Sequence, residues 1–487
     1  MPKRNRITIS VFNRLIFALL LATLWIAAAP LQAAQPEQLI AGFGFSDSDI
    51  GFVLVDPQSG RTFDEKHPDA LFLPASVTKL PTVYAAKQIL GAGYRFPTTL
   101  LRHGADLYLQ GGGDPVLTAN DLEALAAQLP RAKGNSASGR FFYDDGLMPS
   151  LPETNDRQPV AAVYNAGIGA LDVNFNRIEV SWSRRNADSP LEFRATSVAD
   201  GLIVPTDWVD FAPAAADLPP EMPFLYAGDG SADHWQYSTR LPDQGATFLP
   251  VKGSSLHTAL IFRQLAILAG TSLPPAQPGR APADAEIIGR IESRPLADII
   301  PGLLHYSNNL SAELLGLAAT RQLTGRALSL SDSSRTLNAW LEARLPGVDW
   351  RGFRLENHSG LSLHSRISPR QMASLLVLIG ADPVVTASLP TLNHGGITAA
   401  ASNGPPERLL AGKSGTMDYA SGLVGYLAAR DGRPLAFAIF VFDRDRRAAL
   451  DATFDGRILE PTPQARDWTR RARALEAALL KRWMANF

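Results

Sequence analysis

The sequence predicts an α+β fold in which antiparallel strands are flanked by helices, and three observations support this class. Turn signals that join antiparallel strands occur near both ends of the chain, at residues 57–60 and at Asp431-Gly432. Apolar residues at helical spacing begin near Pro295 and return between Pro369 and Gly380. The stretch 143–282 differs, because short β-like runs alternate there with loops rich in Pro, Ala and Asp. That stretch is therefore expected to be organised differently from the rest of the chain, with linkers or domain edges inside it.

Individual elements follow from local patterns. Residues 50–55 and 61–66 are expected to pair as strands, and a helix is expected to begin near Ser76. Three glycines precede Asp114 and permit a tight turn, and Thr118 or Asn120 is a suitable cap for the next helix. The remaining expected elements are strands at 106–109, 177–182, 423–429 and 435–442, a helix at 463–483, and linkers or domain edges at 213–223 and 274–282.

Composition limits the kind of protein. The chain has 487 residues, which suggests about three domains, and its hydrophobic share of 46% and charged share of 19% fit a folded core. The formal net charge is -1 without a block of like charge, so neither nucleic acid nor an anionic membrane surface is an expected partner. The chain has no cysteine, which excludes disulfides, thiolate zinc sites, a cysteine nucleophile and lipid anchoring at a processed cysteine.

The first 34 residues have the pattern of a secretory signal peptide. Basic residues at positions 3, 4 and 6 precede an apolar run from Leu15 to Ala29, and small residues provide a cleavage site after Ala33 or Ala34. An uncleaved membrane anchor is the alternative, but the run is shorter than the roughly 20 residues that a spanning helix needs. We therefore expect a mature chain that is soluble outside the cytoplasm.

The first candidate for chemistry is Ser76 with Lys79, one helical turn later. Residues three apart share a helix face, so the hydroxyl and the amine are expected within hydrogen-bond reach. A serine nucleophile needs an adjacent base, and lysine serves as one when burial or a nearby cation lowers its pKa. Of the eight lysines in the chain, only Lys79 has a serine three positions before it. For this motif alone, a surface lysine beside a capping serine remains an alternative.

The second candidate is Ser307-Asn308-Asn309. The Ser307 hydroxyl is suited to relaying a proton, and the Asn309 amide can both donate to and accept from a substrate backbone. Taken alone, this tripeptide is equally consistent with a helix N-cap.

The third candidate is Lys413-Ser414-Gly415-Thr416, just before the C-terminal strands. Lys413 and the hydroxyls of Ser414 and Thr416 are suited to holding a substrate carboxylate. Gly415 has no side chain, so a substrate is expected to lie along this strand edge. The N–H groups of Thr416 and Ser76 would then form an oxyanion hole.

The string Gly412-Lys413-Ser414 also occurs in phosphate-binding loops. Such a loop requires a further glycine five residues before Gly412, where this chain has Glu407, and its setting is a loop before a helix. That alternative is rejected. The order S-x-x-K, S-x-N and K-[ST]-G is instead the signature of penicillin-recognising serine enzymes.

The spacing narrows the resemblance. Ser307 follows Ser76 by 231 residues and Lys413 follows Ser307 by 106, whereas compact serine β-lactamases place the second motif much closer to the first. The layout resembles the DacB-type D-alanyl-D-alanine carboxypeptidase/endopeptidases, the low-molecular-mass class C penicillin-binding proteins. The resemblance covers nearly the whole mature chain and is carried by residues 74–79, 112–115, 164–176, 307–313, 359–362 and 413–416.

The resemblance implies a domain plan. Residues 35–98 and 284–487 would form a penicillin-binding, transpeptidase-like catalytic domain with an antiparallel sheet flanked by helices. Residues 99–283 would form inserted smaller accessory domains of α/β type, two of them nested. The one departure in the motifs is Ser414, where the family more often has threonine; the hydroxyl is kept, so function is expected to be kept as well.

The resemblance also implies a mechanism. Ser76 attacks the carbonyl of the penultimate D-alanine and Lys79 accepts the serine proton. Ser307 relays a proton to the leaving amine, and Asn309 orients the substrate amide. Lys413 neutralises the terminal carboxylate and helps to keep Lys79 deprotonated. Water then releases the acyl-enzyme.

Partners and location follow from the same resemblance. The expected substrates are peptidoglycan stem peptides in the periplasm, with β-lactams as covalent inhibitors, no cofactor and no metal. Asp172 is a candidate for the pocket that receives the diaminopimelate side chain. His358 and His364 do not form a ligand cluster and are expected in solvated loops.

Two other functions stay open from the sequence. A β-lactamase or esterase with the same motifs would turn penicillin over rapidly instead of keeping it as an adduct. An inactive peptidoglycan-binding protein is disfavoured because Ser76, Lys79, Ser307, Asn309 and Lys413 are all present. The sequence does not distinguish cleavage of the terminal D-alanine from cleavage of the cross-link.

Overall fold

The computed structural model describes residues 36–129, 139–186, 188–220, 222–228, 232–392, 410–453 and 461–487. The predicted signal peptide, residues 1–34, lies outside the described residues. Within the described ranges, no helix has both the length and the apolar character needed to cross a membrane.

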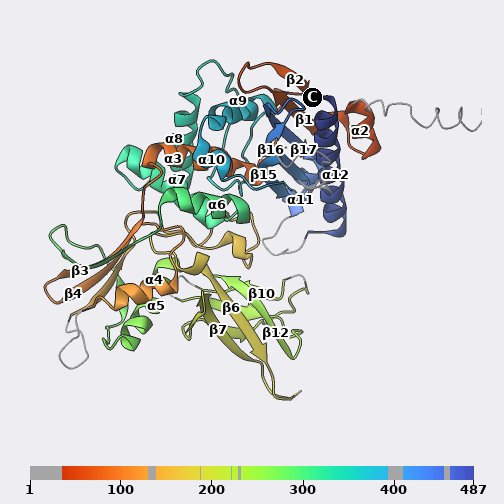
Figure 1. Cartoon of the computed structure of the whole chain (residues 1–487). Coiled ribbons are helices and arrows are strands. Elements are labelled where there is room, and N and C mark those ends of the chain that lie inside the picture. Colours follow the sequence, from red (N-terminus) through yellow and green to blue (C-terminus); the bar gives the residue numbers. More distant parts are fainter. Residues whose placement is uncertain are drawn as a thin grey trace, which may run out of the picture.

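A five-stranded sheet is built from both ends of the chain (Figure 1). Its strand order is β15-β16-β17-β1-β2, and all of its pairs are antiparallel. The predicted turn at Asp431-Gly432 joins β16 to β17, and Gly432 has a φ of 84° that favours glycine. The strand bounds are β1 Ile50–Val55, β2 Thr62–Lys66, β15 Leu410–Met417, β16 Ala420–Ala428 and β17 Pro434–Phe442. The predicted antiparallel sheet is confirmed.

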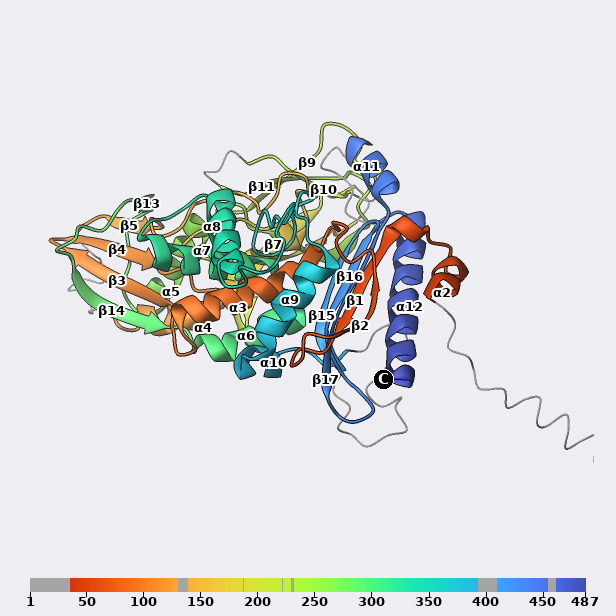
Figure 2. The ribbon, with the colours of Figure 1, turned by 90° about the horizontal axis from the view of Figure 1, so that it is seen from above.

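Helices cover both faces of this sheet (Figures 1 and 2). Successive side chains on a strand point to opposite faces. Phe52 is accordingly buried with Trp468 and Trp483 of α12 (Pro463–Asn486) on one face. Its neighbour Val53 is buried on the other face among residues of the remaining helices. Those helices are α3 (Lys79–Leu90), α6 (Leu296–Tyr306), α7 (Asn309–Thr324), α8 (Leu330–Glu342), α9 (Pro369–Gly380) and α10 (Pro383–Ala387).

The predicted helices at 369–380 and 463–483 are therefore confirmed, the second with three more residues. Short helices complete this part of the molecule. They are α2 (Pro36–Gly42), α11 (Arg444–Thr453) and the 3₁₀ turns η1 (Asp47–Asp49) and η2 (Ala75–Thr78).

Three smaller sheets lie on the side of the molecule away from α12 (Figure 2). The first has the order β13-β5-β4-β3-β14, the second β12-β6-β7-β8 and the third β10-β11-β9. The strand bounds are β3 Pro97–His103, β4 Asp106–Gly111, β5 Phe141–Asp144, β6 Arg177–Ser183, β7 Glu192–Ala199, β8 Leu202–Pro205, β9 Asp210–Pro213, β10 Phe224–Tyr226, β11 His234–Tyr237, β12 Gln244–Pro250, β13 Ala276–Pro278 and β14 Glu286–Glu292.

The helices of this region are α4 (Ala119–Ala126), α5 (Ser254–Leu268) and the turns η3 (Val163–Asn165) and η4 (Asn174–Asn176). The predicted cap at Thr118 is confirmed, because its side chain accepts a hydrogen bond from the Asp121 N–H at 3.2 Å. The expected linker 274–282 contains β13, which pairs with β5. Strand β14 pairs with β3, so residues 286–292 belong to a sheet of this region although they follow the predicted boundary at 284.

Candidate active site

Ser76 lies in η2, the tight turn that leads into α3, and Lys79 is the first residue of α3. Ala75, immediately before the serine, has a φ of 47°, which L-residues with a β-carbon rarely adopt. Such strained positions persist only where surrounding structure holds them, and they cluster at functional sites. The strain at Ala75 is thus consistent with a turn that presents Ser76 for chemistry.

The Lys79 amine contacts three oxygens and is completely buried. Its Nζ lies 2.8 Å from Ser76 Oγ, 2.7 Å from Asn309 Oδ1 and 2.8 Å from the Ser359 carbonyl oxygen. The amide oxygen and the carbonyl can only accept hydrogen bonds, so they hold two N–H groups of the amine in either protonation state. A neutral amine has two N–H groups and one lone pair. With both N–H groups directed to Asn309 and Ser359, the lone pair points toward Ser76. The geometry therefore suits removal of the serine proton.

Electrostatics favour that neutral form. Burial lowers the pKa of Lys79 well below its usual range, and the nearby Lys413 charge lowers this pKa further, while Glu313 acts in the opposite direction. Lys413 is itself 3% exposed, and burial lowers the pKa of its amine to about 8. Its Nζ donates to the Ser414 carbonyl oxygen at 2.8 Å.

The Ser307-Asn308-Asn309 motif forms the junction between α6 and α7. Ser307 ends α6 in the left-handed conformation, with a φ of 55°. Asn308 caps α7, since its side chain accepts from the Ser311 N–H at 2.8 Å. This junction places Asn309 at the start of α7, where its Oδ1 contacts Lys79 and its Nδ2 donates to the Tyr164 carbonyl at 3.0 Å.

The third motif lies on the edge strand β15, which packs directly on the Ser76 turn. A β-carbon placed on Gly415 would lie 2.8 Å from the Ser76 nitrogen and 2.6 Å from the Pro74 carbonyl oxygen. Those contacts are with backbone atoms, so only glycine permits this approach. A β-carbon on Gly360 would similarly lie 1.9 Å from the Ala75 carbonyl oxygen. Two glycines thus allow β15 and the 357–362 loop to close around the serine turn.

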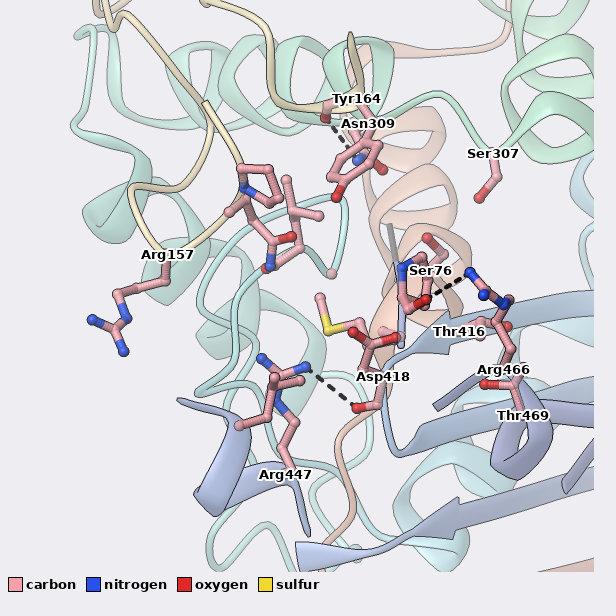
Figure 3. Close-up of a pocket in the computed structure, with 18 of the residues that line it drawn as sticks. Ser76, Arg157, Tyr164, Ser307, Asn309, Thr416, Asp418, Arg447, Arg466 and Thr469 are labelled. Carbon is pink, nitrogen blue, oxygen red and sulfur yellow. Dashed lines mark hydrogen bonds between the residues drawn. The ribbon is translucent and has the colours of Figure 1, made fainter. Parts of the chain in front are cut away.

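A pocket of about 760 Å³ opens beside Ser76 (Figure 3). Ser76, Ser307, Asn309 and Thr416 line it together. The other lining residues are Ala75, Arg157, Gln158, Pro159, Tyr164, Gly360, Leu361, Met417, Asp418, Arg447, Leu450, Pro461, Thr462, Arg466, Thr469, Arg470 and Arg473. Lys79, Lys413, Ser414 and Gly415 are not among the residues that line it.

Several residues of this site were given no individual role by the sequence. Tyr164 and Arg157 reach the pocket from the region of the smaller sheets, and the arginines of α12 reach it from the far end of the chain. Glu313 is fully buried beneath the site and accepts from the N–H groups of His358 and Ser359 at 2.9 and 3.0 Å. It therefore fixes the loop whose Ser359 carbonyl contacts Lys79.

Two expected placements differ from the structure. Asp172 does not line the pocket: it is buried among polar groups, accepts from Asn176 Nδ2 at 2.5 Å and from the Gly169 N–H at 3.1 Å, and burial raises its pKa to about 7. The prediction that His358 is solvated was wrong. His358 is 1% exposed and pairs with Ser333 at 2.8 Å, because Gly316 leaves room for its ring. The described residues contain no cluster of three or more side chains suited to a metal ion.

The fold and the serine–lysine site are those of the penicillin-binding, β-lactamase-like class of proteins. Residues 34–456 match the D-Ala-D-Ala carboxypeptidase 3 (S13) family. The chain belongs to this family and is therefore a serine peptidase, as the resemblance predicted.

Individual relatives agree with this assignment. A D-alanyl-D-alanine carboxypeptidase of Actinomadura sp. (strain R39) is 29% identical over 434 residues, which cover 80% of this chain and 77% of the relative. The D-alanyl-D-alanine carboxypeptidase DacB of Haemophilus influenzae is 23% identical over 81% of this chain and 85% of its own. The crystal structure of penicillin binding protein 4 (dacB) from H. influenzae superposes with a TM-score of 0.71 at 19% identity, covering 92% of this chain and 99% of that one. This superposition supports the α+β fold.

Proposed function

We propose that this protein hydrolyses D-alanyl-D-alanine bonds in peptidoglycan stem peptides, as a carboxypeptidase, an endopeptidase or both, through an acyl-enzyme on Ser76. The observation that carries the proposal is the contact between the buried Lys79 amine and Ser76 Oγ at 2.8 Å, with two acceptor oxygens holding the rest of the amine. The family to which the chain belongs supports the choice of bond.

In the first step, Ser76 Oγ attacks the carbonyl carbon of the penultimate D-alanine and its proton passes to Lys79 Nζ. The negative charge that develops on the carbonyl oxygen is stabilised by the N–H groups of Ser76 and Thr416. The C–N bond then breaks: Ser307 delivers a proton to the leaving amine and takes up in its place the proton held by Lys79, while Asn309 orients the substrate amide. Water attacks the ester and restores Ser76.

Lys413 acts on Lys79 in this scheme. Lys413 is buried and does not line the pocket, so of its two expected roles we assign to it the electrostatic one, which is to disfavour protonated Lys79. Gly415 allows the strand edge to pack against the serine turn. Ser414 and Thr416 lie two residues apart on β15 and therefore share one face of the strand, on which their hydroxyls are proposed to bind the substrate. Asp172 lies outside the pocket and has no part in this scheme.

The same chemistry implies covalent inhibition by β-lactams, because their leaving group stays tethered after acylation. We also propose export to the periplasm, removal of residues 1–34, and the division into a catalytic unit (35–98 and 284–487) and inserted accessory domains (99–283). The pairing of β14 with β3 favours ending the inserted part after Glu292.

The test is digestion of purified cross-linked and uncross-linked muropeptides with the mature protein, with products identified by mass. Loss of a terminal D-alanine identifies carboxypeptidase activity, and conversion of dimers to monomers identifies endopeptidase activity. The Ser76→Ala variant must yield neither product. Rapid turnover of a fluorescent penicillin, without a stable adduct and without muropeptide cleavage, would instead identify a β-lactamase.

A further inference from the structure

Five arginines line the pocket, and one of them contacts the proposed substrate-binding strand. Arg473 Nη2 donates to Thr416 Oγ1 at 3.2 Å, and both residues line the pocket beside Ser76. A guanidinium has five N–H donors, so this contact leaves others available. Since the Thr416 oxygen accepts from arginine, its own O–H is free to donate. The pair therefore offers donors from two groups to one incoming anion.

Other arginines of the same pocket have different partners. Arg470 forms an ion pair with Asp467, and Arg447 forms one with Asp451. Arg473 forms no ion pair with any carboxylate in the described part of the chain, and its side chain is exposed. Its charge is thus available to a ligand.

Arg473 is presented by a firmly packed helix. One turn further along α12, the buried Glu476 accepts a hydrogen bond from Ser421 Oγ at 2.7 Å. Ser421 is the cross-strand partner of Thr416 on β16. The polar contact that anchors α12 therefore lies beside the strand pair that carries Thr416, and the apolar face of α12 is buried against the sheet.

We propose that Arg473, together with the Thr416 hydroxyl, binds the substrate carboxylate next to the scissile amide and makes the enzyme selective for acids over amides at that position. The inference rests on the proposed function and replaces Lys413 in the role of neutralising this carboxylate. A terminal D-alanine carries that carboxylate, and so does the D-centre of a cross-linked diaminopimelate, so the assignment holds for both substrates. Guanidinium and carboxylate are matched in shape as well as in charge.

The experiment compares a synthetic stem peptide ending in D-Ala-D-Ala with the same peptide ending in a carboxamide. For Arg473→Gln we expect kcat/KM on the acid to fall by about 10- to 100-fold, as for loss of a charged hydrogen bond, with little change on the amide. Arg473→Lys keeps the positive charge but lacks the paired N–H donors of a guanidinium, so it should recover part of the selectivity. Lys481→Gln is the matched control, because Lys481 is an exposed cation of the same helix that does not line the pocket, and it should keep the wild-type ratio of kcat/KM on the two peptides.

The inference would be overturned if Arg473→Gln lowered kcat/KM equally on the acid and the amide peptide, or if it left the ratio of the two values unchanged. Arg473 is exposed, so all three variants are expected to unfold at the wild-type temperature. If the wild-type protein neither releases D-alanine from the acid peptide nor is labelled by penicillin, the proposed function is wrong, and this inference is wrong with it. If the wild-type protein cleaves both peptides equally well, only the inference about Arg473 is wrong and the proposed function stands.

Discussion

The Lys79 amine lies 2.7 Å from the Asn309 side-chain oxygen, although 230 residues separate them in the sequence. The intervening chain forms the three smaller sheets, and α3 and α7 nevertheless pack together in one buried core. The two motifs are therefore parts of one hydrogen-bonded group. The consequence is that Lys79 is oriented by a residue of a distant helix and not by its own helix alone.

Replacing Lys79 with arginine should abolish most acylation. Arginine stays protonated at ordinary pH, so it cannot accept the proton of Ser76. We expect labelling by a fluorescent penicillin to slow by about 10²- to 10⁴-fold. Lys87→Arg is the control on the same helix, since Lys87 pairs with Asp382 at 2.8 Å and arginine can keep that pair. Near-normal labelling of Lys79→Arg would exclude Lys79 as the base.

Replacing Lys413 with methionine should move the pH dependence of acylation. Lys413 has a pKa of about 8, so it is mostly charged at neutral pH and its repulsion lowers the pKa of Lys79. Without that charge, protonated Lys79 is less disfavoured and its pKa rises. The acid limb of the acylation rate against pH should therefore shift to higher pH. An unshifted limb in a folded Lys413→Met protein would contradict the electrostatic role.

The Glu313→Gln variant should shift the same limb in the opposite direction. Glu313 raises the pKa of Lys79, so removing its charge lets that pKa fall and moves the limb to lower pH. Its carboxylate also accepts two backbone N–H groups in the core, and an amide cannot accept both with the same geometry. We expect a loss of about 1–3 kcal/mol in the free energy of unfolding, measured with urea. A shift in the same direction as Lys413→Met would refute this reading.

The elements and motifs set by local patterns were predictable from the sequence. Residues 50–55 form a strand and Pro369–Gly380 form a helix as expected, because apolar periodicity and turn residues act over short distances. The contact of Ser76 with Lys79 was predictable for the same reason, since both lie within one turn. The meeting of Asn309 and Thr416 in one pocket was also predictable, because three individually weak motifs occur in an order known for this class of enzymes.

The remaining features depend on contacts between distant segments. Burial of His358 requires the space left by Gly316, and neither residue indicates this alone. Arg473 is one of many arginines in an amphipathic helix, and only the packing of α12 beside β16 brings it to Thr416. Asp172 was a candidate only through the family resemblance, and the fold encloses it with Asn176 instead of opening it to the pocket.

Strand β15 packs so closely on the serine turn that position 415 has no room for a side chain. In Gly415→Ala the new methyl group would lie 2.6–2.8 Å from backbone atoms of Pro74, Ser76 and Val77, none of which can rotate away. The strand must then move outward and separate the Thr416 N–H from Ser76, so we expect penicillin acylation to slow by about 100-fold. Gly93→Ala, with nothing within 4 Å of the added carbon, should acylate normally. If Gly415→Ala also acylates normally, Thr416 does not contribute to the oxyanion hole.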